Sequence, residues 1–113
     1  MRKIIFSALI VASSLFADSV VNVYSSRHYD SDKMVFDAFT KETGIKVNVI
    51  QDKIEAITQK LELEGKDTIA DVFMTVGVGD LYNVKQKGLL QPISSKIVDE
   101  NIPLDLMDKD KNW

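Results

Sequence analysis

Apolar and polar positions along the chain change between two periods. Short β-branched runs at residues 19–25 (SVVNVYS), 45–50 (IKVNVI) and 70–76 (ADVFMTV) are bounded by polar residues or glycine, which predicts three buried strands. The intervening stretches have the longer helical period. Helices are therefore predicted between the strands and, at residues 79–88, after the last of them.

The three predicted helices have end signals, and the first two have an apolar stripe. Asp30 or Ser31 is available to cap the start of the first helix. Charged side chains lie on the face of this helix opposite its apolar stripe. Gly44, Gly65 and Gly88 stand where the three helices are expected to end. The apolar stripes are formed by Val35, Phe36 and Phe39 in the first helix and by Ile54, Ile57 and Leu61 in the second.

Strand and helix alternate with short links, an order typical of parallel βαβ units in an α/β layer. Crossovers of this kind are right-handed, and we place the first strand between the other two, which gives the strand order 2-1-3. Ligands of open parallel sheets bind outside the carboxyl ends of the strands, where successive connections leave in opposite directions. The stretch SSRHYDSD, residues 25–32, follows the first strand at that end. We therefore expect the ligand there.

The stretch MRKIIFSALIVASSLFA, residues 1–17, has the features of an export signal peptide. Arg2 and Lys3 form a charged start, an apolar run follows, and Ala17 is a small residue at the cut. The run is short for a bilayer span and nothing like it recurs, so no stable membrane insertion is expected once the signal is cleaved. Residues 18–113 would then be the mature, exported chain.

Charge and cysteine content argue against several classes of protein. The 113-residue chain has a net charge of −3, and loss of Arg2 and Lys3 with the leader makes the mature chain more acidic. Its basic residues are dispersed, which disfavours nucleic-acid binding. The absence of cysteine excludes disulfides, thiolate metal sites and a lipoprotein. An enzyme is not expected, since there is one histidine and no serine in a nucleophile-elbow context.

The candidate chemistry lies in three consecutive residues of the expected ligand loop. Tyr29 offers a phenolate, a hard anionic oxygen donor suited to a hard trivalent cation, and His28, the only histidine, stands beside it. Arg27 could hold a bidentate anion or a carboxylate next to the site. Each also has an ordinary structural interpretation, such as a hydrogen-bonded surface histidine or a tyrosine that covers apolar side chains. A metal-binding protein and an anion-binding protein both stay open at this point.

Three segments of the chain resemble a known family. NVYSSRHYDSDKMVFDAFTKETGIKVNVI, LELEGKDTIADVFMTVGVGDLYNVKQKGLLQPISSK and NIPLDLMDKDKNW, in this order, are similar to the start of the periplasmic ferric-iron-binding proteins of bacterial ABC importers. The resemblance implies a two-lobed, class II substrate-binding protein that closes on Fe³⁺, with or without a synergistic anion. It also implies a location in the periplasm and, as partners, an ABC permease and its ATPase.

The resemblance assigns roles to the loop residues. Tyr29 would be a metal-ligating phenolate, His28 a ligand or near-ligand, and Arg27 a supporting or anion-binding residue. The order Arg-His-Tyr matches the subtype that relies mainly on tyrosines, and Val76 stands where the other subtype has a carboxylate. The resemblance therefore predicts a metal site built on His28 and Tyr29.

Members of the family are much longer than this chain and have a full second lobe with further tyrosines. Residues 18–113 are therefore expected to be the N-terminal portion of the first lobe, which is incomplete. We expect Tyr24 in the core or on the sheet surface, and Tyr82 packed or in solvent, which leaves few donors for iron. The alternatives are a binding protein for another metal or a small anion, or a non-functional truncated fragment.

Overall fold

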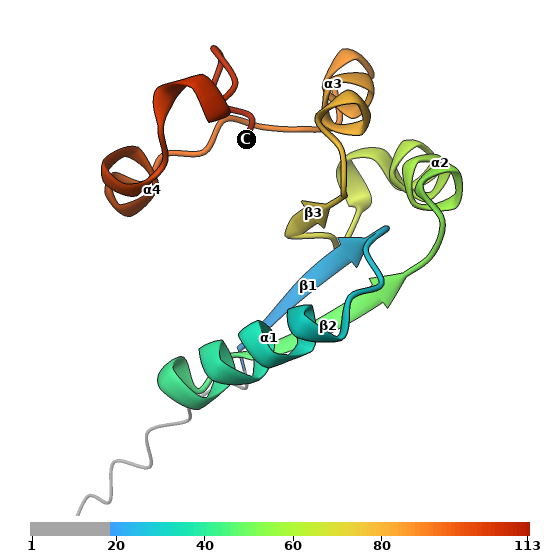
Figure 1. The fold of residues 1–113 in the computed structure, drawn as a ribbon. Helices are drawn as coiled ribbons and strands as arrows, with labels where there is room; N and C mark the ends of the chain where they lie inside the picture. Colours follow the sequence, from blue (N-terminus) through green and yellow to red (C-terminus); the bar gives the residue numbers. More distant parts are fainter. Residues whose placement is uncertain (1–18) are drawn as a thin grey trace, which may run out of the picture.

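A three-stranded parallel sheet forms the centre of the fold in the computed structural model, which describes residues 19–113. The strands are β1 (Val20–Ser25), β2 (Lys46–Gln51) and β3 (Val72–Met74), and they lie in the order β2-β1-β3 (Figure 1). Both pairings are parallel. The predicted α/β fold and the strand order 2-1-3 are therefore confirmed. The export signal predicted at residues 1–17 lies outside the described residues.

β3 is shorter than the strand predicted at residues 70–76. Beyond its end, the Thr75 hydroxyl accepts a hydrogen bond from the Ser26 hydroxyl (2.9 Å) and donates one to the Asp80 carboxylate (2.9 Å). The second of these bonds links the residue after β3 to Asp80 in the first turn of the next helix. The chain therefore turns into the next helix after Met74.

Four α-helices and two 3-10 turns complete the described part of the chain. The first helix begins at Asp30 with Tyr29 at the N-cap position and no side-chain cap, so the prediction that Asp30 or Ser31 caps it is wrong. Asp30 lies in the first turn, where the helix dipole favours an acidic side chain. Gly44 ends this helix with φ 74°, as predicted. The elements are α1 (Asp30–Thr43), α2 (Ile54–Glu64), η1 (Gly65–Asp67), α3 (Val78–Gln86), α4 (Lys96–Asn101) and η2 (Leu104–Leu106).

The core lies between the sheet and α2. Tyr24 of β1 is fully buried and packs with Ile57 and Leu61 of α2. Successive side chains of a strand point to opposite faces, so the next residue, Ser25, points to the face that α1 covers (Figure 1). The two helices therefore flank opposite faces of the sheet. Partly buried apolar residues that pack against the core are Ile50, Ala70, Phe73 and Leu89.

The predicted apolar stripe of α1 is only partly turned toward the sheet. Val35 is 66% exposed and Phe39 38%, whereas Asp32, Phe36 and Thr40 are half-buried. These half-buried residues recur at i, i+4 and i+8, so they form the face of α1 nearest the sheet. In the stripe of α2, in contrast, Ile57 and Leu61 are buried in the core and Ile54 is half-buried.

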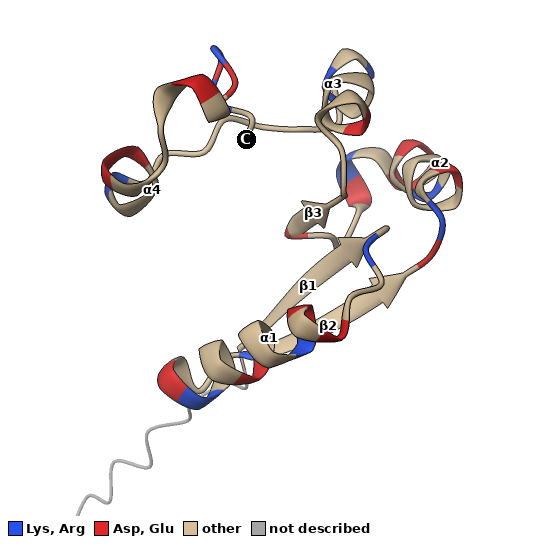
Figure 2. Ribbon diagram, viewed as in Figure 1, with Lys and Arg blue, Asp and Glu red and all other residues tan. Residues whose placement is uncertain are grey.

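The surface of the described chain carries mixed charge. Figure 2 shows basic and acidic residues on each of the labelled helices, in agreement with the dispersed charge predicted from the sequence. None of the described helices is long and apolar enough to cross a membrane.

Candidate functional site

The loop between β1 and α1, residues 26–29, lies at the carboxyl end of the parallel sheet (Figure 1). It is tied to the end of β3, because the Ser26 N–H donates to the Met74 carbonyl (2.9 Å). The Ser26 hydroxyl also donates to the Thr75 hydroxyl (2.9 Å). These bonds hold the loop where β1 and β3 both end, which is the position that the ligand rule for parallel sheets indicates.

Arg27, His28 and Tyr29 form one cluster in this loop. The Arg27 Cζ atom lies 4.9 Å from the centroid of the Tyr29 ring, a cation–π distance. The rings of His28 and Tyr29 stack, with centroids 5.3 Å apart and planes inclined by 19°. Tyr29 stays 46% exposed. An external ligand can therefore reach the side chain that the sequence singled out as the phenolate donor.

Asp32, in the first turn of α1, binds Arg27 with both carboxylate oxygens. The Arg27 Nε–H donates to Oδ2 (2.7 Å) and the Nη2–H to Oδ1 (2.9 Å). This hydrogen bonding lowers the pKa of Asp32 and raises the pKa of Arg27 relative to their ordinary values. The sequence offered a bidentate anion or a carboxylate as the partner of Arg27, and the structure shows a carboxylate there. The sequence did not indicate that Asp32 would be this carboxylate.

A cavity of about 490 Å³ lies beside the cluster. It is lined by the loop, by the first turns of α1 and by Val47, Val49 and Gln51 of β2. One water molecule occupies about 30 Å³ of liquid volume, so this space exceeds that of a small hydrated ion. The cavity therefore gives room for an ion together with a small anion.

Within residues 19–113, metal donors at this cluster are few. No group of three or more His, Cys, Asp or Glu side chains in that range is arranged to hold a metal ion. Val76, at the end of the third strand region, is apolar and 58% exposed. Of the three cluster residues, Tyr29 offers an oxygen that fits a hard cation and His28 a nitrogen that fits it less well. Most of an octahedral shell would have to come from other groups.

The two remaining tyrosines are placed as the sequence predicted. Tyr24 is fully buried in the core, and its hydroxyl donates to the Glu64 carboxylate. Burial, and then this hydrogen bond, raise the pKa of the Tyr24 phenol above its ordinary value of 10.0. Tyr82 lies on α3 and is 56% exposed. Neither belongs to the cluster around Tyr29.

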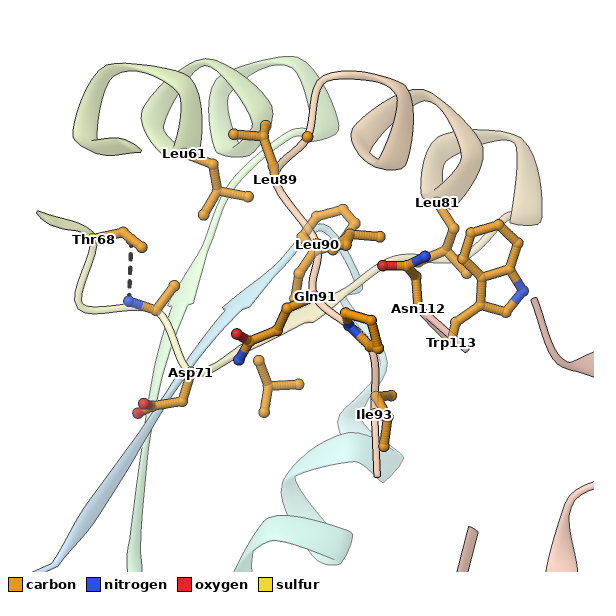
Figure 3. Close-up of a pocket in the computed structure, with 15 residues that line it drawn as sticks. Leu61, Thr68, Asp71, Leu81, Leu89, Leu90, Gln91, Ile93, Asn112 and Trp113 are labelled. Atoms are coloured by element: carbon orange, nitrogen blue, oxygen red, sulfur yellow. Dashed lines mark hydrogen bonds between the residues drawn. The ribbon is translucent and has the colours of Figure 1, made fainter. Parts of the chain in front are cut away.

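A second cavity, of about 670 Å³, is lined by residues of β3, by Leu61 of α2 and by the segment that follows α3. Figure 3 shows Leu61, Leu89, Leu90 and Trp113 around it, so its walls are mainly apolar. Its one carboxylate, Asp71, accepts a hydrogen bond from the Asn22 N–H (2.8 Å). The larger cavity therefore lacks the donors that a metal site requires.

Comparison with known proteins gives consistent results. The family model for bacterial extracellular solute-binding proteins matches residues 25–113. The chain is 40% identical over 93 residues to Iron uptake protein A1 of Synechocystis sp., which covers 82% of this chain and 26% of that protein. It is 32% identical over 94 residues to the Major ferric iron-binding protein of Neisseria gonorrhoeae, covering 83% of this chain and 28% of that protein.

Solved structures show the same likeness. The Trichodesmium protein FutA (IdiA), in complex with iron and citrate ligands, superposes with a TM-score of 0.80 at 45% identity over 84% of this chain and 30% of its own. The ferric binding protein from Campylobacter jejuni gives a TM-score of 0.78 at 45% identity over 80% of this chain and 29% of its own. The chain thus spans only 26 to 30% of these four relatives' lengths. Because its family match extends over most of its length, the chain belongs to the bacterial extracellular solute-binding protein family.

Proposed function

We propose that this chain provides part of the ferric-iron site of an extracytoplasmic solute-binding protein that serves an ABC importer. The observation that carries the proposal is the exposed Tyr29 side chain at the carboxyl end of the sheet, in contact with His28 and Arg27. Relatives of this chain are named for ferric iron, which supports the same cargo. Tyr29 is the metal ligand in this proposal, and His28 is a ligand or near-ligand.

The donor chemistry favours a trivalent cation over a softer ion. A phenolate oxygen is hard and anionic, so it gains most from a small, highly charged ion. Within residues 19–113, no group of three or more His, Cys, Asp or Glu side chains is arranged to hold a metal ion, so groups other than Tyr29 and His28 must complete the shell. A synergistic anion is one source, since the Trichodesmium relative is in complex with iron and citrate ligands. Arg27 stands beside Tyr29, in the supporting or anion-binding role that the sequence predicts.

The proposed protein works in the periplasm and delivers its cargo to an ABC permease, which a cytoplasmic ATPase energises. The apolar leader at residues 1–17 supports export. Deletion of residues 2–17 is expected to keep the protein in the cytoplasm and to abolish ferric uptake. Cell fractionation and uptake of labelled iron measure both effects, and uptake that continues unchanged would contradict the role.

Substitution of Tyr29 tests the site directly. The full chain is titrated with ferric nitrilotriacetate, a chelate that leaves part of the octahedral shell open for protein donors. Binding through Tyr29 is expected to produce a visible phenolate-to-iron absorption band. Tyr29→Phe should remove the band and weaken binding by about a hundredfold, because the anionic donor is lost while the ring remains.

Tyr82→Phe is the matched control, since Tyr82 is exposed on α3 and away from the cluster. It should leave both the band and the affinity unchanged. A Tyr29→Phe chain that keeps its colour and affinity would show that Tyr29 is not the ligand. A wild-type chain that binds a small anion but gives no band with iron would favour the anion-binding alternative.

A further inference from the structure

Asp32 connects two parts of the candidate site. Its backbone N–H donates to the Tyr29 carbonyl (3.0 Å), while its carboxylate binds the Arg27 guanidinium at 2.7 and 2.9 Å. Arg27 in turn lies over the Tyr29 ring, with Cζ 4.9 Å from the centroid. The three residues therefore form a closed set of contacts: Asp32 to Tyr29, Asp32 to Arg27, and Arg27 to Tyr29.

The Arg27–Asp32 pair is also better sheltered than the other charged pair of α1. The side chains of Arg27 and Asp32 are 28% and 18% exposed, whereas those of Lys33 and Asp37 are 78% and 66% exposed. Solvent-exposed ion pairs contribute little, but a bidentate arginine–carboxylate pair with restricted exposure fixes its geometry more strongly. Asp32 is thus the group that determines where the long Arg27 side chain lies.

We propose that Asp32 is a positioning residue of the metal site, which holds the Arg27 guanidinium against the Tyr29 ring and cancels its charge where a cationic cargo binds. The inference rests on the proposed function for the nature of the cargo. Without Asp32, a mobile and unpaired cation would stand beside a site for Fe³⁺. Repulsion between the two cations would weaken binding of the metal.

The geometric part of this inference can be tested without iron. Protons held over the face of an aromatic ring give upfield-shifted NMR signals, so the δ-methylene of Arg27 should be shifted upfield by the Tyr29 ring in the full wild-type chain. Asp32→Asn should return these signals to their ordinary positions. Asp30→Asn is the matched control, because it removes the same charge from the same turn of α1. It should leave the Arg27 signals where they are.

The functional part is measured by titration with ferric nitrilotriacetate. Asp32→Asn is expected to raise the dissociation constant by about tenfold. In an Arg27→Gln background, Asp32→Asn should have almost no further effect, because Asp32 acts through Arg27. This double-substitution cycle separates positioning from a general loss of negative charge.

Each result supports or overturns the inference. The inference is overturned if the Arg27 signals are not upfield in the wild type or stay upfield in Asp32→Asn. It is also overturned if they move equally in Asp30→Asn. An unchanged tenfold effect of Asp32→Asn in the Arg27→Gln background overturns it too. A wild-type chain without any iron band shows instead that the proposed function fails, and the NMR comparison still decides whether Asp32 positions Arg27.

Discussion

The hydroxyl of Tyr24 lies 2.9 Å from each carboxylate oxygen of Glu64, so the central strand is hydrogen-bonded to the end of α2. Lys60 adds an ion pair to the same carboxylate (3.2 Å). Burial raises the pKa of Glu64, but the hydrogen bonds from Tyr24 and Lys60 outweigh it and leave the pKa below its ordinary value. Tyr24 therefore has a structural role, and this separates it from Tyr29 of the same chain.

Tyr24→Phe is expected to lower the free energy of unfolding by about 1 kcal/mol, because the Glu64 carboxylate loses its buried donor while the ring still fills the core. Urea unfolding measures the change, and ferric binding should stay as in the wild type. Tyr82→Phe, at an exposed position, should change the stability by less than about 0.5 kcal/mol. Equal effects of the two substitutions would contradict a structural role for the Tyr24 hydroxyl.

Much of the fold follows from the spacing of apolar residues. The runs at 19–25 and 45–50 become β1 and β2 almost unchanged, since β-branched residues that alternate with polar ones suit a strand between two layers. The third run is shortened to Val72–Met74, and just after its carboxyl end Thr75 hydrogen-bonds to Ser26 and Asp80. These contacts join residues that are distant in the sequence or in different elements. Periodicity alone carries no signal for them.

Helix faces were less predictable than helix positions. Periodicity identified Val35, Phe36 and Phe39 as the apolar stripe of α1, yet Val35 is 66% exposed and Phe39 38%, and only Phe36 is half-buried. Which face of a helix meets the sheet depends on how the helix crosses it, and here Asp32, Phe36 and Thr40 take that place. The pattern therefore indicated that α1 is a helix without fixing its rotation about its axis.

The candidate site was predictable in position but not in its electrostatics. Arg27, His28 and Tyr29 follow the first strand, so the topology placed them at the carboxyl end of the sheet. The role of Asp32 was not foreseen, because an aspartate in the first turn of a helix is explained well enough by the helix dipole. A search for carboxylates four or five residues after an arginine, across a loop-to-helix boundary, would have found it.

Acid should destabilise the fold through Asp108. Lys85 donates to Asp108 (2.7 Å), and the Asn112 side chain does so too (2.7 Å). The bond from Lys85 is the main cause that lowers the pKa of Asp108 from 3.8 to about 2. A lowered folded-state pKa gives stability that is present above the unfolded value and is lost as the pH falls through the folded value. Stability should therefore decrease between pH 3.8 and about 2.

Substitution isolates this contribution. Asp108→Asn should be less stable than wild type at pH 6 and should lose less stability than wild type between pH 3.8 and about 2. Urea unfolding at a series of pH values measures both. Asp110→Asn is the control, because Asp110 also binds Lys85 but its side chain is 73% exposed. If Asp108→Asn loses as much stability as the wild type in this pH range, other carboxylates cause the loss.

His28 is expected to matter less for iron than Tyr29. Imidazole is a softer donor than phenolate, so His28→Ala should weaken ferric binding by only about tenfold. The visible band should persist, because the phenolate oxygen is still present. Titration with ferric nitrilotriacetate checks both expectations against Tyr29→Phe. Loss of the band in His28→Ala, with the Tyr29 side chain intact, would show that the stacked imidazole is needed for Tyr29 to bind.

The outer edge of β3 is expected to make the described chain self-associate. β3 pairs only with β1 in the described sheet, so backbone donors and acceptors on its other side have no strand partner there. Unpaired edges of this kind act as templates for another chain, and the run ADVFMTV has the β-branched and apolar character that favours such pairing. Light scattering over a range of concentrations should show association of the full chain.

Two substitutions to lysine test whether the edge is responsible. Val72 lies on β3 and Val20 on the central strand β1, and they are similarly exposed at 42% and 45%. Lysine on an edge strand opposes pairing because its charge would have to be buried against the incoming chain. Val72→Lys should therefore shift association to concentrations higher by about tenfold, whereas Val20→Lys should change it little. If both substitutions reduce association equally, exposed apolar surface drives the association instead of the strand edge. If the wild type stays monomeric, the edge of β3 is not a template for pairing.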